Sequence, residues 1–172
     1  MKREAFTMIE LSVVILIMAI AAAAVTLNVR RYLGGARMDD AAGAIADFDR
    51  TTRAAALAQD RPLRMAIALS AGKIQRADQA GHLLPGSGLV LPGAFRFSRL
   101  LLRERDIRDG EATVSCSRTG LTPTYAIELD DGSRRQWLVV AGLTGQFLKV
   151  DSEKEAKDIL AAGTPPGRGN AH

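Results

Sequence analysis

The polarity of the chain changes along its N-terminal third. Residues 6–27 are apolar or small, and Glu10 is the one charged residue among them. From Met38 onward, apolar residues recur at spacings of three and four, which places them on one side of an α-helix. That side carries Met38, Ala41, Ile45, Phe48, Thr52 and Ala55.

The charged residues of the same stretch fall largely on the opposite side. They are Asp39, Asp40, Asp47, Asp49, Arg50 and Arg53. Gly34 and Gly35 interrupt the pattern only weakly, and Pro62 ends it. We therefore predict one long helix that is apolar on all sides in its first half and amphipathic in its second half. Its second half should cover a β-sheet.

Short alternating runs follow Pro62 and predict antiparallel strands. Residues 63–69 and 73–76 form a hairpin, 89–91 and 94–102 are strands, and 103–111 are a solvated charged loop. An antiparallel meander then begins at residues 112–116. Its other strands cover 125–129, 137–141 and 147–150, with Tyr125, Ile127 and Leu129 facing inward and Trp137, Val139 and Ala141 returning on the partner strand. The predicted fold class is α+β, a long N-terminal helix packed on antiparallel sheets.

A second helix is predicted at residues 152–163. Ser152 and Glu155 have the spacing of a capping box, and Gly163 ends the helix. Ala156, Ile159 and Leu160 share one apolar side, which packs on the domain or presents a surface to a partner. Residues 164–172, rich in Pro and Gly, should be disordered.

The apolar run is long enough to cross a membrane. A helix over residues 6–27 would be about 33 Å long, close to the roughly 30 Å of a bilayer core. A secretory signal peptide is the competing interpretation, but its apolar region is shorter. Lys2 and Arg3 precede the run, which favours a cytoplasmic N-terminus. Glu10 would be costly in hydrocarbon unless another group neutralises it.

Composition excludes several classes of function. The chain has 172 residues, of which 47% are hydrophobic and 24% charged, and its net charge is +4. These values fit one globular domain with additional segments, and the charge is too dilute to indicate nucleic-acid binding. Cys116 is the only cysteine, so an intramolecular disulfide is excluded, and its alternating neighbours predict a buried strand position. His82 and His172 lack a carboxylate or thiol at ligand spacing, so we predict no metal, no cofactor and no catalytic residues.

Residues Ala5-Phe6-Thr7-Met8-Ile9-Glu10-Leu11 resemble the start of type IV pilins and type II secretion pseudopilins. The resemblance implies that a prepilin peptidase cuts between Ala5 and Phe6, removes the leader 1–5 and methylates the new amino terminus of Phe6. It implies that Glu10 then pairs with the charged amino terminus of Phe6 on a neighbouring subunit, which sets the register of assembly. Two departures are Ala5 in place of the usual Gly and a missing proline within the span.

The order of turns and strands from Ser117 to Val150 is similar to that of the H-type minor pseudopilins and of the fimbrial T and U minor pilins. The resemblance implies a transmembrane and assembly helix at 6–29, a periplasmic head at 30–151, and an inner-membrane location before assembly into a pseudopilus. The implied partners are other pseudopilins, the prepilin peptidase, the inner-membrane assembly platform and secreted cargo.

Three functions remain as alternatives. The first is a minor pseudopilin of a type II secretion system. The second is a minor type IV pilus subunit active in pilus assembly or DNA uptake, which a basic strip on the head would favour. Candidates for that strip are Arg96, Arg99, Arg103, Arg105 and Arg108, diluted by nearby carboxylates. The third is a membrane-tethered periplasmic enzyme, for which the sequence offers no catalytic set.

Overall fold

Within the residues that the structure describes, the elements follow the order of a long helix, nine strands and a short helix. The computed structural model describes residues 8–93, 95–103 and 105–162, with the backbone alone for residues 24–34. The helices are α1 (Met8–Ala58) and α2 (Glu153–Ala162). The strands are β1 (Leu63–Ala68), β2 (Lys73–Ala77), β3 (Leu83–Val90), β4 (Arg96–Leu102), β5 (Arg105–Ile107), β6 (Glu111–Cys116), β7 (Tyr125–Asp130), β8 (Arg135–Val140) and β9 (Phe147–Val150).

Helix α1 confirms the prediction of one long helix, because it continues through Gly34 and Gly35. It ends earlier and for a different reason than expected. Asp60 adopts a left-handed conformation with φ of 45°. The Arg61 N–H donates to the Ala56 carbonyl and the Asp60 N–H to the Leu57 carbonyl, both at 3.2 Å. This is a Schellman motif, which caps the last carbonyls of the helix before Pro62 is reached.

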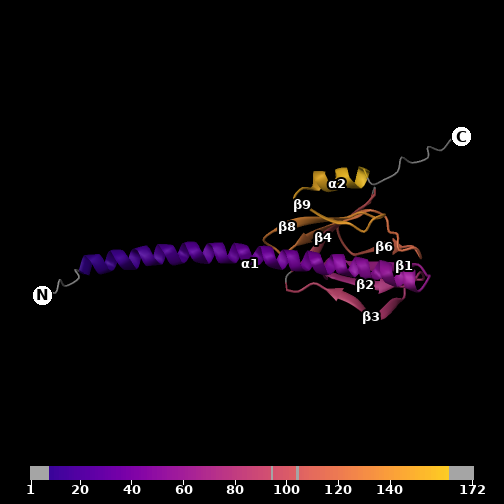
Figure 1. The fold of residues 1–172 in the computed structure, drawn as a ribbon, viewed down its shortest axis with the longest axis horizontal. Helices are drawn as coiled ribbons and strands as arrows, with labels where there is room; N and C mark the ends of the chain where they lie inside the picture. The colour runs from indigo at the N-terminus through magenta and orange to yellow at the C-terminus, as the bar shows by residue number, and fades with distance from the viewer. Residues whose placement is uncertain (1–7, 94, 104, 163–172) are drawn as a thin grey trace. The chain divides into compact units, whose positions relative to one another are not determined.

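The chain divides into two units, Met1–Asp40 and Ala41–His172. The second unit contains the C-terminal part of α1, all the described strands and α2, as Figure 1 shows. Its strands form two antiparallel sheets, a first sheet in the order β3-β2-β1-β6 and a second in the order β5-β4-β7-β8-β9. We call this unit the head. The fold class predicted for the head, helix plus antiparallel sheets, is confirmed.

The predicted meander is right for β7, β8 and β9 and wrong for β6. Strand β6 pairs with β1, Leu63 lying opposite Cys116, and therefore belongs to the first sheet. Ala112, Val114 and Cys116 are buried as predicted. Alternation shows which side of a strand is buried, but it carries no information about which strand lies alongside.

Two edge strands differ from the sequence prediction: β3 is longer than expected, and β5 was expected to be part of a loop. Strand β3 covers Leu83–Val90 and carries Pro85 and Gly86 in a bulge opposite β2. Pro and Gly are tolerated at a sheet edge, where N–H groups need no partner strand. Strand β5 pairs with β4, so part of the predicted charged loop is a short edge strand. The expected start of β4 at Ala94, and Glu104 of the same loop, lie outside the described residues.

The second sheet is covered on both faces. All six residues of β7 are buried. Trp137 lies opposite Glu128, and Val139 opposite Ala126, so both belong to the face opposite Tyr125 and Ile127. The sequence interpretation treated these residues as parts of one inward layer, which is wrong, because a sheet buried on both faces has two apolar layers.

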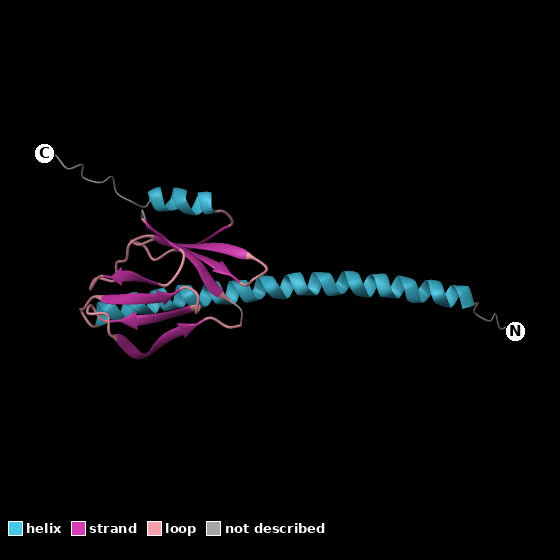
Figure 2. Cartoon of the chain, turned by 180° about the vertical axis from the view of Figure 1, so that it is seen from behind, coloured by secondary structure: helices cyan, strands magenta, loops and turns pink. Residues whose placement is uncertain are grey.

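Helix α2 covers the face that carries Trp137. The Glu155 N–H donates to Ser152 Oγ at 3.2 Å, so the predicted N-cap is confirmed. Ala156 and Leu160 are buried with Trp137, Val139 and Val150, and Ile159 is half-buried against them. Figure 2 shows α2 beside the sheet and the strands around the C-terminal part of α1. Of the two predicted alternatives for α2, packing on the domain is therefore the one observed. Gly163 and the tail 164–172 lie outside the described residues.

Candidate assembly site and a buried polar cluster

The N-terminal part of α1 exposes apolar side chains in the isolated chain. Ten large apolar residues are exposed there: Met8, Ile9, Leu11, Val13, Val14, Ile15, Leu16, Ile17, Met18 and Ile20. They occur at nearly every position, so they surround the helix rather than follow one side of it. A helix that is apolar on all sides is normally buried, either in a protein core or in a membrane.

Glu10 lies in the first turn of this apolar stretch. Val13 and Val14, three and four residues on, share its side of the helix. A carboxylate in the first turn of a helix is favoured by the helix dipole. Ala5 and Phe6, the predicted cleavage site and methylation site, lie outside the described residues.

The described part of the chain contains no helical stretch that meets the length and hydropathy of a membrane span. The span predicted from the sequence begins at Phe6 and includes side chains from residue 24 onward, which lie outside the described side chains.

The head contains a buried polar cluster that the sequence interpretation missed. Asp49 and Arg53 form an ion pair of 2.6 Å, with side chains only 3% and 12% exposed. The Tyr125 hydroxyl donates to the other oxygen of Asp49 at 2.9 Å. Asp49 and Arg53 had been placed on the polar side of α1. That assignment is wrong for these two residues.

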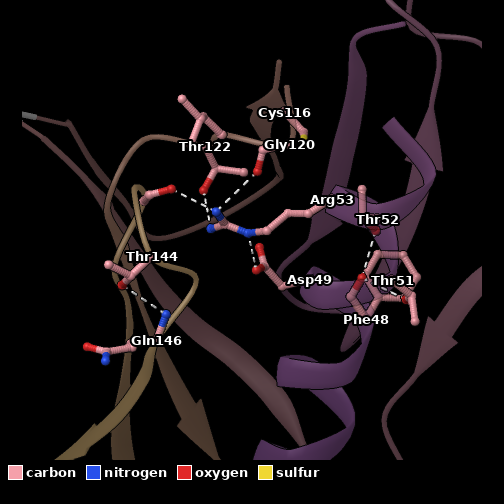
Figure 3. Close-up of polar contacts among 12 residues, drawn as sticks. Phe48, Asp49, Thr51, Thr52, Arg53, Cys116, Gly120, Thr122, Thr144 and Gln146 are labelled. Atoms are coloured by element: carbon pink, nitrogen blue, oxygen red, sulfur yellow. Dashed lines mark hydrogen bonds and ion pairs between the residues drawn. The ribbon is translucent and has the colours of Figure 1, made fainter. Parts of the chain in front are cut away.

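Arg53 reaches from α1 to two loops of the head (Figure 3). Its Nη1 donates to the carbonyl oxygens of Gly142 at 2.7 Å and Gly120 at 3.3 Å. Its Nη2 donates to the hydroxyl of Thr122. A planar guanidinium has five N–H donors spread over three nitrogens, whereas a lysine ammonium has three donors on one atom. Arg53 therefore joins α1 to the loop before β7 and to the loop after β8.

The electrostatics of the cluster follow from its burial. Among the described residues, each buried side-chain nitrogen or oxygen has a hydrogen-bond partner. Burial raises the pKa of the Tyr125 hydroxyl well above its ordinary value, and the charge of Asp49 raises it further. Tyr125 therefore stays protonated and donates to Asp49. The cluster is a satisfied structural network that fixes α1 against two loops.

The buried side of α1 is rotated slightly from the apolar side that the sequence predicted, which explains why the polar cluster was not predicted. The buried residues of α1 within the head include Ile45, Asp49, Thr52 and Ala56, whereas Phe48 and Ala55 are only half-buried. Asp49 thus occupies a position that the pattern gave to Phe48. Hydropathy assigns an aspartate to the solvent side. Arg53, its counter-charge, lies only four residues away, but Tyr125, which donates to its other oxygen, is far away in sequence.

The predicted basic strip is largely neutralised by carboxylates. Arg99 binds Glu153 at 2.7 Å and Asp106 at 2.7 Å. The guanidinium of Arg99 also lies over the ring of Trp137, 5.4 Å from its centroid. Arg96 lies 3.5 Å from Asp130, and Arg108 lies 3.0 Å from Asp106. Arg99 therefore fastens α2 to the second sheet instead of presenting charge to a partner.

One further expectation about charged groups was wrong. His82 has a carboxylate neighbour, since its Nδ1 lies 3.1 Å from Asp78 Oδ2. Within the residues that the structure describes, no group of three or more His, Cys, Asp or Glu side chains could hold a metal ion. Asp78 and His82 form a loop contact, in which the Asp78 carboxylate also accepts the His82 N–H at 2.8 Å.

The N-terminal segment is the part of the chain that matches a known family. Residues 1–26 match the family model of the prokaryotic N-terminal methylation motif. The matched segment contains Ala5, Phe6 and Glu10 and runs into the apolar part of α1. The chain therefore carries the type IV pilin-like methylation signal, which is common to pilins and pseudopilins. No curated protein and no solved structure matches the chain.

Proposed function

We propose that the chain is a minor pseudopilin, a structural subunit of a type II secretion pseudopilus. The observation that carries the proposal is the methylation signal at residues 1–26, which includes the start of a helix whose apolar side chains are exposed. Such a helix needs a membrane before assembly and other helices of its kind afterwards. The head, an α+β unit with antiparallel sheets, would then lie in the periplasm, and the subunit would have no enzymatic role.

The proposed maturation begins at the leader. A prepilin peptidase removes residues 1–5, and the amino group of Phe6 is methylated. Residues 6–29 span the inner membrane with the N-terminus in the cytoplasm, and the periplasmic part of the chain begins at residue 30. On assembly, Glu10 pairs with the Phe6 ammonium of a neighbouring subunit. A subunit displaced along the filament would bury both charges alone, which costs more than the pair itself gains.

The alternative of a pilus subunit for DNA uptake has less support. That alternative would be favoured by a free basic strip on the head, but Arg99 is held by two carboxylates and Arg96 and Arg108 each lie near one. Deleting the gene separates the two functions. We expect loss of protein secretion with surface pili intact, whereas loss of pili with intact secretion would contradict the proposal.

Glu10→Ala tests the assembly mechanism. The variant should remain in the membrane, but its recovery in sheared filaments should fall by at least about a hundredfold, because an unpaired Phe6 ammonium costs about 3–5 kcal/mol. Ser12→Ala is the matched control, two residues away in the same apolar stretch, and should assemble normally. Normal assembly of Glu10→Ala would contradict the pairing.

Mass spectrometry of the mature chain tests the cleavage site. The expected polypeptide begins with N-methylated Phe6, and Ala5→Asp should leave the leader attached. A mature chain that begins at any other residue would contradict the assignment of Ala5, Phe6 and Glu10.

A further inference from the structure

Three exposed leucines lie around the buried Arg53. They come from separate segments, since Leu57 ends α1, Leu121 precedes β7 and Leu143 follows β8. Their exposed fractions are 63%, 44% and 75%. The other large apolar residues exposed on the described head, Leu83, Val90 and Leu148, all belong to the edge strands β3 and β9. Leu57, Leu121 and Leu143 belong to no edge strand, and we call them the leucine patch.

Hydrogen bonds of the backbone bring the segments of the leucine patch together. The carbonyls just before Leu121 and Leu143, those of Gly120 and Gly142, both accept hydrogen bonds from Arg53 Nη1. The Thr122 N–H also donates to the Gly142 carbonyl at 3.4 Å, so the two loops touch. Leu57 lies one turn beyond Arg53 on the same side of α1.

Close contacts at Gly120 and Gly142 fix the positions of the two loops that carry Leu121 and Leu143. Gly120 has φ of 76°, and a Cβ placed there would lie 3.3 Å from the Arg53 carbonyl oxygen. A Cβ at Gly142 would overlap the backbone of Thr122 and Pro123. The loops therefore lie against α1 and against each other with little freedom to move. Exposed apolar groups held in one geometry lose little entropy on binding, which is the property of a docking surface.

The charges beside the patch select the partner. Arg118 lies three residues before Leu121, and Arg61 lies four residues after Leu57; both are exposed. The register of β1 and β6 places Leu63 opposite Cys116, so the segments that carry Arg61 and Arg118 continue from the same end of these strands. Asp60 is the acidic residue near them. The rim is therefore mainly basic and complements carboxylates.

We propose that the leucine patch docks the head of a neighbouring, different filament subunit through an apolar surface rimmed by carboxylates. The inference rests on the proposed function and names a second contact of the subunit, in addition to the Glu10 pair. Arg53 is a positioning residue for this contact, because it holds both loops but is itself buried.

Filament recovery of full-length Leu143→Glu, compared with Leu148→Glu, tests the proposal. Leu148 is 42% exposed and lies on edge strand β9, so it controls for an added surface charge. We expect recovery of Leu143→Glu to fall about tenfold, as the loss of one buried leucine predicts, and that of Leu148→Glu to stay within about twofold. Equal recovery of the two variants would overturn the proposal. Both variants should retain leader removal and the melting temperature of the parent.

Two further measurements define the partner. Leu143→Lys should assemble better than Leu143→Glu, because a lysine is attracted by the carboxylates of the proposed partner; an equal loss would overturn the acidic rim. Cysteine cross-linking through Leu121→Cys should not join two copies of this chain, and a homodimer as the main product would overturn the choice of a different subunit. Failure of the proposed function is distinguished from these results by normal assembly of Glu10→Ala.

Discussion

The two faces of the second sheet are each covered by a helix that an arginine fastens. On the face of Tyr125, Arg53 of α1 pairs with Asp49 in the interior, 12% and 3% exposed. On the face of Trp137, Arg99 of β4 pairs with Glu153 of α2, which is 39% exposed, and with Asp106. The first arginine binds backbone carbonyls of two loops, whereas the second binds only side chains and stacks on an indole ring.

The two arginines differ in whether water can hydrate the carboxylate partner once the ion pair is broken. If the ion pairs of Arg99 open, the partly exposed carboxylates of Glu153 and Asp106 are hydrated at once, so the net stabilisation is small. If Arg53 is lost, Asp49 stays buried without its counter-charge, and the loop carbonyls lose their donor. Arg53, whose partner Asp49 is buried, therefore determines the position of α1 and of the leucine patch, while Arg99, whose partners Asp106 and Glu153 are 33% and 39% exposed, adjusts how firmly α2 is held.

The largest expected effect is that of Arg53→Met. It should lower the free energy of unfolding by about 3–5 kcal/mol, because it leaves a buried carboxylate uncompensated. Urea denaturation of the detergent-solubilised chain measures it. Arg50→Met is the matched control, since Arg50 pairs with Asp47 on the same helix but both are largely exposed. A change below about 1 kcal/mol in Arg53→Met would show that Arg53 stabilises the head no more than an exposed ion pair does.

A smaller effect is expected for Arg99→Met. The ion pairs are partly hydrated and the stacking on Trp137 is worth about 0.5–1 kcal/mol, so the free energy of unfolding should fall by roughly 1 kcal/mol. The loss should be local, and amide exchange should speed up in α2 more than in β7. Uniform acceleration across both elements would mean that Arg99 supports the whole head.

The smallest expected effect is that of acid pH, which should weaken the packing of α2 on the second sheet. Arg99, followed by Lys157, lowers the pKa of Glu153 to about 2, and Arg99 lowers the pKa of Asp106 to about 2. A carboxyl whose pKa is lower in the folded chain stabilises it above the ordinary pKa of about 4, and the effect is lost as pH falls toward 2.

The fluorescence of Trp137, the only tryptophan, reports this change. Its emission should shift to longer wavelength between about pH 4 and pH 2, before the head unfolds. In Glu153→Gln most of the shift should be absent, because the main titrating group is gone. A shift of equal size in that variant would assign the transition to another group.

Most elements of the head could be predicted from its sequence, because they depend on local patterns. Ser152 and Glu155 indicated the start of α2, and Ala156 and Leu160 its buried side. The turn at Asp130–Ser133 follows from Asp and Gly chemistry, and Gly132 has φ of 86°. The first part of strand β3 escaped prediction because Pro85 and Gly86 resemble loop residues, and only the place of β3 at the sheet edge allows them in a strand.

The N-terminal signal could also be predicted from local sequence, whereas the cluster around Arg53 could not. The methylation signal with Glu10 is a local motif within one segment, and the family match at residues 1–26 supports it. Asp49 is four residues from Arg53, but the loop groups that Arg53 binds, at Gly120, Thr122 and Gly142, lie more than 60 residues away along the chain. No spacing rule links such positions.

The sequence by itself determined the long helix, the strand pattern, the capped second helix and the N-terminal signal, because periodicity, capping and turn chemistry act between near neighbours. Only the tertiary structure decided that β6 joins β1, that the second sheet is buried on both faces, and that Asp49 and Arg53 lie inside. These features depend on which distant groups meet, since a buried charge is tolerated only where its partners already lie in place.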